Sequence, residues 1–281
     1  MATSISLRSA DDGSVKVKPR PKPSAITVPF NYYPSDDGTD ENLLILLHGL
    51  GDTHIPFGNL GRSLKLPQTA TLAIRAPELQ VIPFLYEEAY QWYTSFDGLG
   101  DLLTNPNPTP ALDLLNRVVT HLTKDCSWQA NRIHLFGFAQ GGTVAAEFAV
   151  KWWRSVLASS HNDSVESSES SEPVASKAIG SVITMCGPLL TYHNTLSSAC
   201  PTPILVASRP SPAETALPPN AMASFKKAFT TVKDFSMGRG EGMPRSKEQW
   251  EPIMRFWSER LSRRPMEGLY EVMSGSTPSA H

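Results

Sequence analysis

Residues 137–142, with the sequence GFAQGG, have the outline of a sharp turn between a strand and a helix. An apolar run precedes the turn, a run rich in small residues follows it, and glycines flank its apex. Turns of this kind hold a nucleophilic serine in a strained backbone conformation, and the glycines let the strand and the helix pass closely. The apex here is Ala139, whose methyl group has no atom that can attack a carbonyl. The pattern therefore predicts a site for nucleophilic catalysis that lacks its nucleophile.

A second motif, LLILLHGLGD at residues 43–52, predicts a buried strand that runs into a His-Gly turn. On scaffolds that transfer acyl groups, the loop after this strand donates one backbone N–H to the developing oxyanion, and the residue after the nucleophile donates another. The two donors in this chain would be Leu50 and Gln140. We expect His48 and Asp52 to lie at the same pocket, with His48 in a structural hydrogen-bonding role.

Together with QWYTSFD at residues 91–97, these motifs resemble the phospholipase/carboxylesterase family, which includes acyl-protein thioesterases and lysophospholipase-like enzymes. The family patterns LHGLGD and GFSQGG match residues 47–52 and 137–142, except that Ala139 replaces the serine. The resemblance extends over about residues 25–261. It implies an α/β-hydrolase fold, a Ser-His-Asp triad, and a pocket lined by Trp92 and Tyr93 that accepts an acyl-ester, acyl-thioester or lysolipid ligand.

The other two triad positions also depart from the family pattern. In the loop 209–219 (RPSPAETALPP), the resemblance places Glu214 where the family has its aspartate, the alternative being a plain surface glutamate in a Pro-rich loop. In residues 238–243 (GRGEGM), Glu241 stands where the family has its histidine. Loss of both the nucleophile and the base favours a natural pseudoenzyme over a single engineered substitution, which would have left the histidine in place.

The sequence leaves three other functions open. Glu214 and Glu241 could converge as a carboxylate pair that activates water directly. The oxyanion donors could sustain weak carboxylesterase or acyl-protein thioesterase activity. The Ser/Glu-rich segment 159–177, whose serines could be phosphorylated, could make the chain a protein-interaction scaffold. No cluster of His, Cys, Asp or Glu has metal-ligand spacing, so we expect no metal and no cofactor.

The elements that must position these residues alternate along the chain in the manner of an α/β fold. Short apolar runs alternate with amphipathic segments, which predicts a central, mostly parallel sheet with helices on both faces. We expect strands within residues 25–33, 42–51, 69–77, 132–138, 178–187, 201–208 and 231–237. We expect helices within residues 107–126, 141–158 and 246–264, the first burying a stripe formed by Leu112, Leu115, Val119 and Leu122.

Composition sets the domain boundaries that we expect. Residues 1–23 form a disordered N-terminal tail, residues 24–264 a single α/β-hydrolase domain, and residues 265–281 a C-terminal tail. Segment 159–177 has almost no large apolar residues, which predicts a mobile insertion in that domain.

Charge and cysteine content indicate which partners and which cellular compartment to expect. The formal net charge of −2 and the dispersed basic residues give no face for nucleic acid. Three cysteines at unrelated spacings suggest neither a disulfide framework nor a zinc site. No apolar run is long enough for a transmembrane segment. These features predict a soluble cytoplasmic protein, with the nucleus left open.

Overall fold

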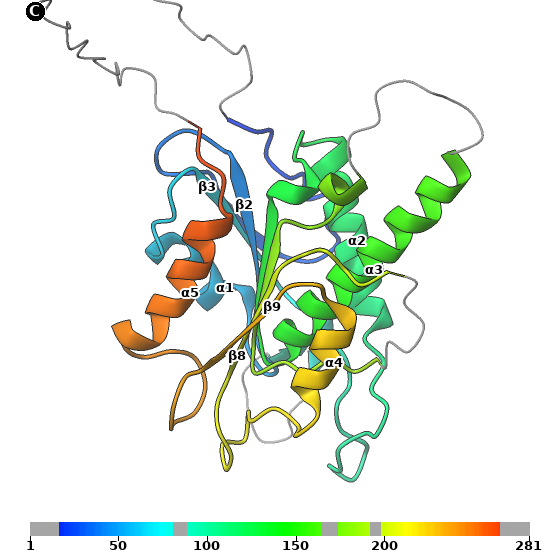
Figure 1. Ribbon diagram of the computed structural model, residues 1–281, viewed down its shortest axis with the longest axis vertical. Helices are drawn as coiled ribbons and strands as arrows, with labels where there is room; N and C mark the ends of the chain where they lie inside the picture. The colour runs from blue at the N-terminus through cyan, green and yellow to red at the C-terminus, as the bar shows by residue number, and fades with distance from the viewer. Residues whose placement is uncertain (1–16, 81–88, 164–173, 192–197, 265–281) are drawn as a thin grey trace, which may run out of the picture.

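The computed structural model describes residues 17–80, 89–163, 174–191 and 198–264, which form a seven-stranded sheet between two layers of helices (Figure 1). The first strand is antiparallel to its neighbour and the other pairings are parallel, as an α/β-hydrolase fold requires. The order across the sheet is β1 (Phe30–Tyr33), β3 (Thr69–Ile74), β2 (Asn42–Leu47), β6 (Ile133–Phe138), β7 (Ser181–Met185), β8 (Ile204–Ser208) and β9 (Val232–Ser236).

Each predicted strand segment contains one of these strands. The central strands β2 and β3 are buried along their whole length, which explains why their sequences are continuously apolar rather than alternating. The edge strand β9 has no fully buried residue, and its residues are half-buried or exposed. A separate two-stranded sheet joins β4 (Glu78–Gln80) to β5 (Ala89–Gln91).

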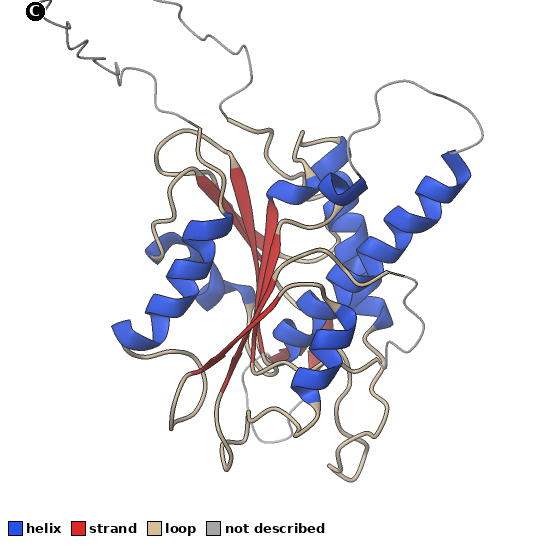
Figure 2. Cartoon of the chain, in the orientation of Figure 1, coloured by secondary structure: helices blue, strands red, loops and turns tan. Residues whose placement is uncertain are grey.

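The two faces of the sheet carry different helices (Figures 1 and 2). Helices α1 (His54–Ser63) and α5 (Lys247–Arg260) cover one face, and α2 (Thr109–Lys124), α3 (Gln140–Asp163) and α4 (Ala221–Ala228) cover the other. The predicted stripe on α2 is buried in the core of that second face. Each such large apolar side chain contributes about 2 kcal/mol when it leaves water.

The strand register brings the motifs to one edge of the sheet. Leu47, the last residue of β2, pairs with Gly137 near the end of β6. Gly137 pairs in turn with Thr184 of β7, and that row continues to Val206 of β8 and Asp234 of β9. The loops that follow these five parallel strands therefore leave the sheet at the same level.

Two predicted boundaries differ from the structure. Helix α3 continues to Asp163, five residues into the segment expected to be a mobile insertion, and residues Val174–Lys177 form a 3₁₀ turn at its other end. Residues 164–173 lie outside the described part of the chain, as does the C-terminal tail from residue 265. Part of the predicted N-terminal tail is docked on the domain, because Pro21 is buried and the N–H of Lys18 donates to Asp40 at 3.0 Å.

The helices of the described residues were also searched for a membrane span. None of them combines the length and the apolar character that crossing a bilayer requires.

Candidate active site

The turn at Ala139 has the backbone of a nucleophile elbow. Ala139 separates β6 from α3 and has a φ of +48°, in the left-handed region that residues with a side chain rarely adopt. Its N–H donates to the carbonyl of Met185 at 2.7 Å, and its carbonyl accepts the N–H of Thr143 at 3.0 Å. The apex is thus fixed to the neighbouring strand on one side and to the first turn of α3 on the other.

Close packing makes two glycines of this turn irreplaceable. A Cβ atom added to Gly137 would lie 2.1 Å from the carbonyl oxygen of Gly141. A Cβ atom added to Gly141 would lie 2.4 Å from the carbonyl oxygen of Leu47. Both distances are far below any real contact, so a side chain at either position would force the elbow open.

The loop after β2 lies against this elbow. Gly49 faces the ring of Phe138, and the carbonyls of Leu47 and His48 face Gly141. The N–H groups of Leu50 and Gln140 take part in none of the hydrogen bonds found among the described residues. Gln140 is the first residue of α3, where an N–H has no acceptor within the helix.

The side chain of Gln140 anchors the predicted pocket segment. Its Oε1 accepts the N–H of Trp92 at 2.9 Å, and its Nε2 donates to the carbonyl of Tyr93 at 2.9 Å and to the hydroxyl of Ser95 at 2.7 Å. Three hydrogen bonds from one buried amide hold the segment against the start of α3.

Trp92 and Tyr93 lie in the core rather than on an open surface. The Trp92 side chain is fully buried, and its indole N–H donates to the carbonyl of His48 at 2.8 Å. Tyr93 is 5% exposed, and burial raises the pKa of its hydroxyl to about 12. In this conformation, therefore, Trp92 supports the wall of the site from behind and offers no surface to a ligand.

His48 is held by backbone atoms on both sides of its ring. Nε2 accepts the N–H of Ala76 at 2.9 Å, so Nδ1 carries the proton that it donates to the carbonyl of Gly49 at 2.7 Å. Burial lowers the pKa of His48 to about 4. Both nitrogens of the neutral ring are therefore engaged in hydrogen bonds that fix the turn. His48 cannot act as a base without breaking one of these bonds.

Asp52 belongs to the same turn. Its carboxylate accepts the N–H of Thr53 at 2.7 Å, and Thr53 is the N-cap of α1. The contact orients Thr53, whose own hydroxyl accepts the N–H of Ile55 in the first turn of α1.

The loops that would carry the acid and the base meet at this edge. Oε1 of Glu241 accepts the N–H of Glu214 at 3.2 Å. The contact therefore uses the backbone of Glu214 and not its carboxylate. Both side chains are exposed, so the burial that a proton-sharing carboxylate pair relies on is missing here.

Arg209, which the sequence did not single out, fixes the loop that contains Glu241. It lies at the end of β8, is 3% exposed, and donates from Nε to the carbonyl of Gly242 at 3.2 Å. Nη1 donates to Met237 at 3.1 Å, and Nη2 donates to Met243 at 3.0 Å. In the sequence, Arg209 is a single arginine after an apolar strand. The neighbouring residues give no indication that its acceptors lie so far along the chain.

His54, the first residue of α1, was likewise not predicted. Its Nδ1 is buried and has no hydrogen-bond partner among the described residues, and burial lowers the pKa of the ring. It follows Leu50 by four residues, so it is a histidine near the loop after β2. The apex residue Ala139 still offers no hydroxyl or thiol that such a base could activate.

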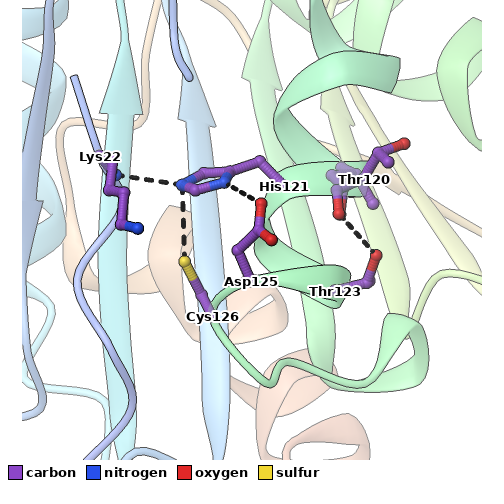
Figure 3. A network of polar contacts seen from close by, with 7 residues as sticks. Lys22, Thr120, His121, Thr123, Asp125 and Cys126 are labelled. Atoms are coloured by element: carbon purple, nitrogen blue, oxygen red, sulfur yellow. Dashed lines mark hydrogen bonds and ion pairs between the residues drawn. The ribbon is translucent and has the colours of Figure 1, made fainter. Parts of the chain in front are cut away.

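A Cys-His-Asp constellation occurs elsewhere, at the C-terminal end of α2 (Figure 3). The Sγ of Cys126 lies 3.6 Å from Nε2 of His121, and Nδ1 of His121 lies 2.7 Å from Asp125. However, Nε2 already accepts the N–H of Lys22 at 3.1 Å. Cys126 is 1% exposed, and burial raises the pKa of its thiol. The group therefore secures the N-terminal segment and is unsuited to nucleophilic catalysis.

The remaining titratable groups of interest are also buried. The ring of His134 bonds to Ser181 at 2.8 Å inside the sheet, and burial lowers its pKa to about 3. Cys126, Cys186 and Cys200 are all free and buried. Across the described ranges, no group of three His, Cys, Asp or Glu side chains is arranged to bind a metal ion.

Comparison with known proteins identifies relatives of the chain. The profile of a family described as Phospholipase/Carboxylesterase matches residues 34–157. An uncharacterized hydrolase of Mycosarcoma maydis is 36% identical over 246 residues, which cover 84% of this chain and 82% of that protein.

Solved structures resemble the chain in fold. The esterase PE8 superposes with a TM-score of 0.64 at 16% identity, over 83% of this chain and 99% of that one. The acyl-protein thioesterase 2 of Zea mays superposes with a TM-score of 0.60 at 17% identity, over 84% of this chain and 100% of that one.

Proposed function

Because the chain belongs to the phospholipase/carboxylesterase family, we propose that it is a pseudoenzyme, which binds an acyl-ester, acyl-thioester or lysolipid ligand without hydrolysing it. In this proposal the chain keeps the hydrolase fold but lacks the serine hydroxyl and the histidine ring that make and break the acyl bond.

The strained alanine carries this proposal. A left-handed backbone at a residue with a side chain costs about 1–3 kcal/mol, and at an elbow that cost serves to present a nucleophile. Ala139 keeps the strained conformation at φ +48° and presents only a methyl group. Removing a triad member typically slows such enzymes by roughly 10⁴- to 10⁶-fold.

The positions of three histidines support the loss of the base, and a fourth, His54, has no nucleophile at Ala139 to activate. Glu241 stands at the family's histidine position, and its carboxylate bonds to the backbone of Glu214. His48 is engaged at both ring nitrogens. His134 is buried within the sheet and His121 binds the N-terminal segment.

Ligand binding rests on the two N–H groups of Leu50 and Gln140. Backbone donors at an elbow stabilise a carbonyl oxygen whether or not a nucleophile attacks it. In this proposal the acyl carbonyl lies beside the methyl group of Ala139, which is smaller than the serine side chain that the family carries there. A zinc- or cofactor-dependent reaction is not part of this proposal, since the chemistry of the site is that of backbone amides.

A serine-directed fluorophosphonate probe and native mass spectrometry test the two halves of the proposal. The unmodified protein should form no covalent adduct, and it should bind S-hexanoyl-N-acetylcysteamine or lysophosphatidylcholine at millimolar concentration. The control for binding is Ala139→Met, whose longer side chain fills the space above the elbow. A probe adduct on the unmodified protein, or measurable ester turnover by it, would mean that the chain is an active carboxylesterase; equal binding by Ala139→Met would move the ligand elsewhere.

The cysteines are the basis for a proposal about the cellular compartment of the protein. Three free thiols, all buried, fit a reducing compartment, and we infer the cytoplasm.

A further inference from the structure

A buried histidine near the end of α2 joins the N-terminal segment 17–24 to the domain (Figure 3). Nε2 of His121 accepts the backbone N–H of Lys22 at 3.1 Å, and Nδ1 lies 2.7 Å from a carboxylate oxygen of Asp125. A neutral imidazole has one donor nitrogen and one acceptor nitrogen, so Nδ1 carries the proton here. The bond to Lys22 therefore exists only while the ring of His121 is neutral.

Few other contacts hold segment 17–24 in place. Its sequence, VKPRPKPS, has proline at every second position in its middle, and proline has no N–H to donate. Among the described residues, the N–H of Lys18 donates to Asp40 at 3.0 Å, and the ammonium of Lys18 lies 5.9 Å from the ring centre of Trp128. Pro21 alone in the segment is fully buried. The contact with the histidine is therefore a large share of what holds the segment.

Protonation changes which partners the ring can have. With a proton on both nitrogens, Nε2 becomes a donor and faces the N–H of Lys22, which is also a donor. The Sγ of Cys126 lies 3.6 Å from Nε2 and can accept in its place, and the carboxylate of Asp125 favours the charged ring. The two charge states of His121 thus have different partners at the same nitrogen.

The groups around this histidine keep their charge over the pH range in which histidines titrate. Burial raises the pKa of the Tyr32 hydroxyl and of the Cys126 thiol, so both stay neutral. Lysine, arginine and aspartate side chains ordinarily stay charged between pH 5.5 and pH 8. The charged and titratable groups of the surrounding elements, namely the segment, the end of α2, β1 and the loop before β2, are Arg20, Lys22, Asp125, Cys126, Tyr32 and Asp40. Histidine is the residue type in this cluster whose charge ordinarily changes in that range.

We propose that His121 is a proton-operated latch, which holds segment 17–24 on the domain while its ring is neutral and releases the segment when the ring is protonated. The two opposed N–H groups break the contact with Lys22, and Nε2 donates to the sulfur of Cys126 instead. Docking of the segment is complete at pH 8 and weakens as the pH falls through the range of a free histidine, because only the released state takes up the proton freely. Release requires no unfolding of the α/β domain.

Hydrogen exchange at the backbone N–H of Lys22 tests the latch. The full chain is labelled with ¹⁵N-lysine, exchange is followed by NMR, and each rate is divided by the intrinsic rate at the same pH. We expect the protection of this N–H to fall about tenfold between pH 7.5 and pH 5.5. His121→Gln has an acceptor that does not titrate, so its protection should be the same at both pH values. The matched control is His134→Gln, which removes a buried histidine that bonds to Ser181 inside the sheet, and there the tenfold fall should persist.

A second variant keeps the test decisive if His121→Gln folds poorly. Asp125 is exposed, and Asp125→Asn keeps an acceptor for the Nδ1 proton while it removes the negative charge. The charged ring is then less favoured, so the loss of protection should move to lower pH. Protection of Lys22 that does not change between pH 7.5 and pH 5.5 in the unmodified protein overturns the proposal. So does a fall that His121→Gln retains, or one that Asp125→Asn leaves at the same pH.

Discussion

The side-chain oxygen of Gln140 accepts the backbone N–H of Trp92 at 2.9 Å, across 48 residues of sequence. The same amide donates to the carbonyl of Tyr93 and to the hydroxyl of Ser95. Residue 140 therefore has two tasks under our proposal. Its backbone N–H faces the ligand, and its side chain holds the segment that supports the wall of the site.

Gln140→Glu separates these tasks, because it keeps the acceptor for Trp92 and loses both donors. A buried charge and an unsatisfied carbonyl at Tyr93 should lower the free energy of unfolding by about 2–4 kcal/mol. The melting temperature at pH 7 should fall by roughly 4–16 °C in a thermal scan. Gln129→Glu, at an exposed position, is the control and should leave it nearly unchanged. An equal effect of the two substitutions would show that the hydrogen bonds of Gln140 contribute nothing specific.

The double variant Ala139→Ser/Glu241→His should restore esterase activity. The serine regains the attacking oxygen, and the imidazole at position 241 lies on the loop that already contacts Glu214. We expect hydrolysis of p-nitrophenyl butyrate to rise on the order of 10²-fold or more above the unmodified protein. Ala139→Ser/Glu248→His is the control, with the histidine on an exposed residue of α5. Equal rates for the two double variants would remove position 241 from the proposed site.

Ala139→Gly should stabilise the protein, although it removes a side chain. Glycine adopts a φ of +48° without strain, and the gain should be about 1 kcal/mol, or 2–4 °C in melting temperature. Ala145→Gly, in the interior of α3 where the backbone is helical, should instead destabilise by about 1 kcal/mol. If Ala139→Gly also destabilises, the elbow is not strained as its φ angle indicates.

Stability should fall between pH 7 and pH 5 because of His48 and His134. Burial lowers the pKa of these rings to about 4 and about 3, below the value near 6.5 of an unfolded histidine. The unfolded chain then takes up protons first, so this stability is complete above about pH 6.5 and is lost as the pH falls towards the folded values. Each ring should account for about 2 kcal/mol by pH 5.

Urea titrations at both pH values measure this loss. In His48→Gln and in His134→Gln, the difference between pH 7 and pH 5 should shrink by about half. A pH dependence that neither substitution changes would assign it to other groups.

The sequence predicted the sheet well because its strands are buried on both faces. A continuous apolar run such as residues 43–47 cannot be a surface helix, which would need a polar face. Each of the seven predicted segments contains a strand. Helix α1 was missed, because Pro56, Gly58 and Gly61 in ten residues indicate a loop. The structure uses Gly61 for close packing, since a Cβ there would lie 3.1 Å from Leu46 and Thr71.

The candidate site was predictable where it depends on local spacing. The elbow and the loop of Leu50 are contiguous motifs, so their residues follow from pattern alone. The roles of Trp92 and Arg209 depend on partners far away in sequence, Gln140 in one case and Met237 to Met243 in the other. No local pattern contains that information.

The buried cysteines can serve as built-in probes of the order of unfolding. Cys126 follows α2, Cys186 follows β7, and Cys200 precedes β8, and each thiol is shielded while the surrounding structure is closed. A short pulse of a water-soluble alkylating reagent, applied at intervals after a jump into denaturant, should mark each thiol only once its own neighbourhood has opened. Weighing the three tagged peptides would then reveal the order in which the layers of the molecule come apart, with no engineered label.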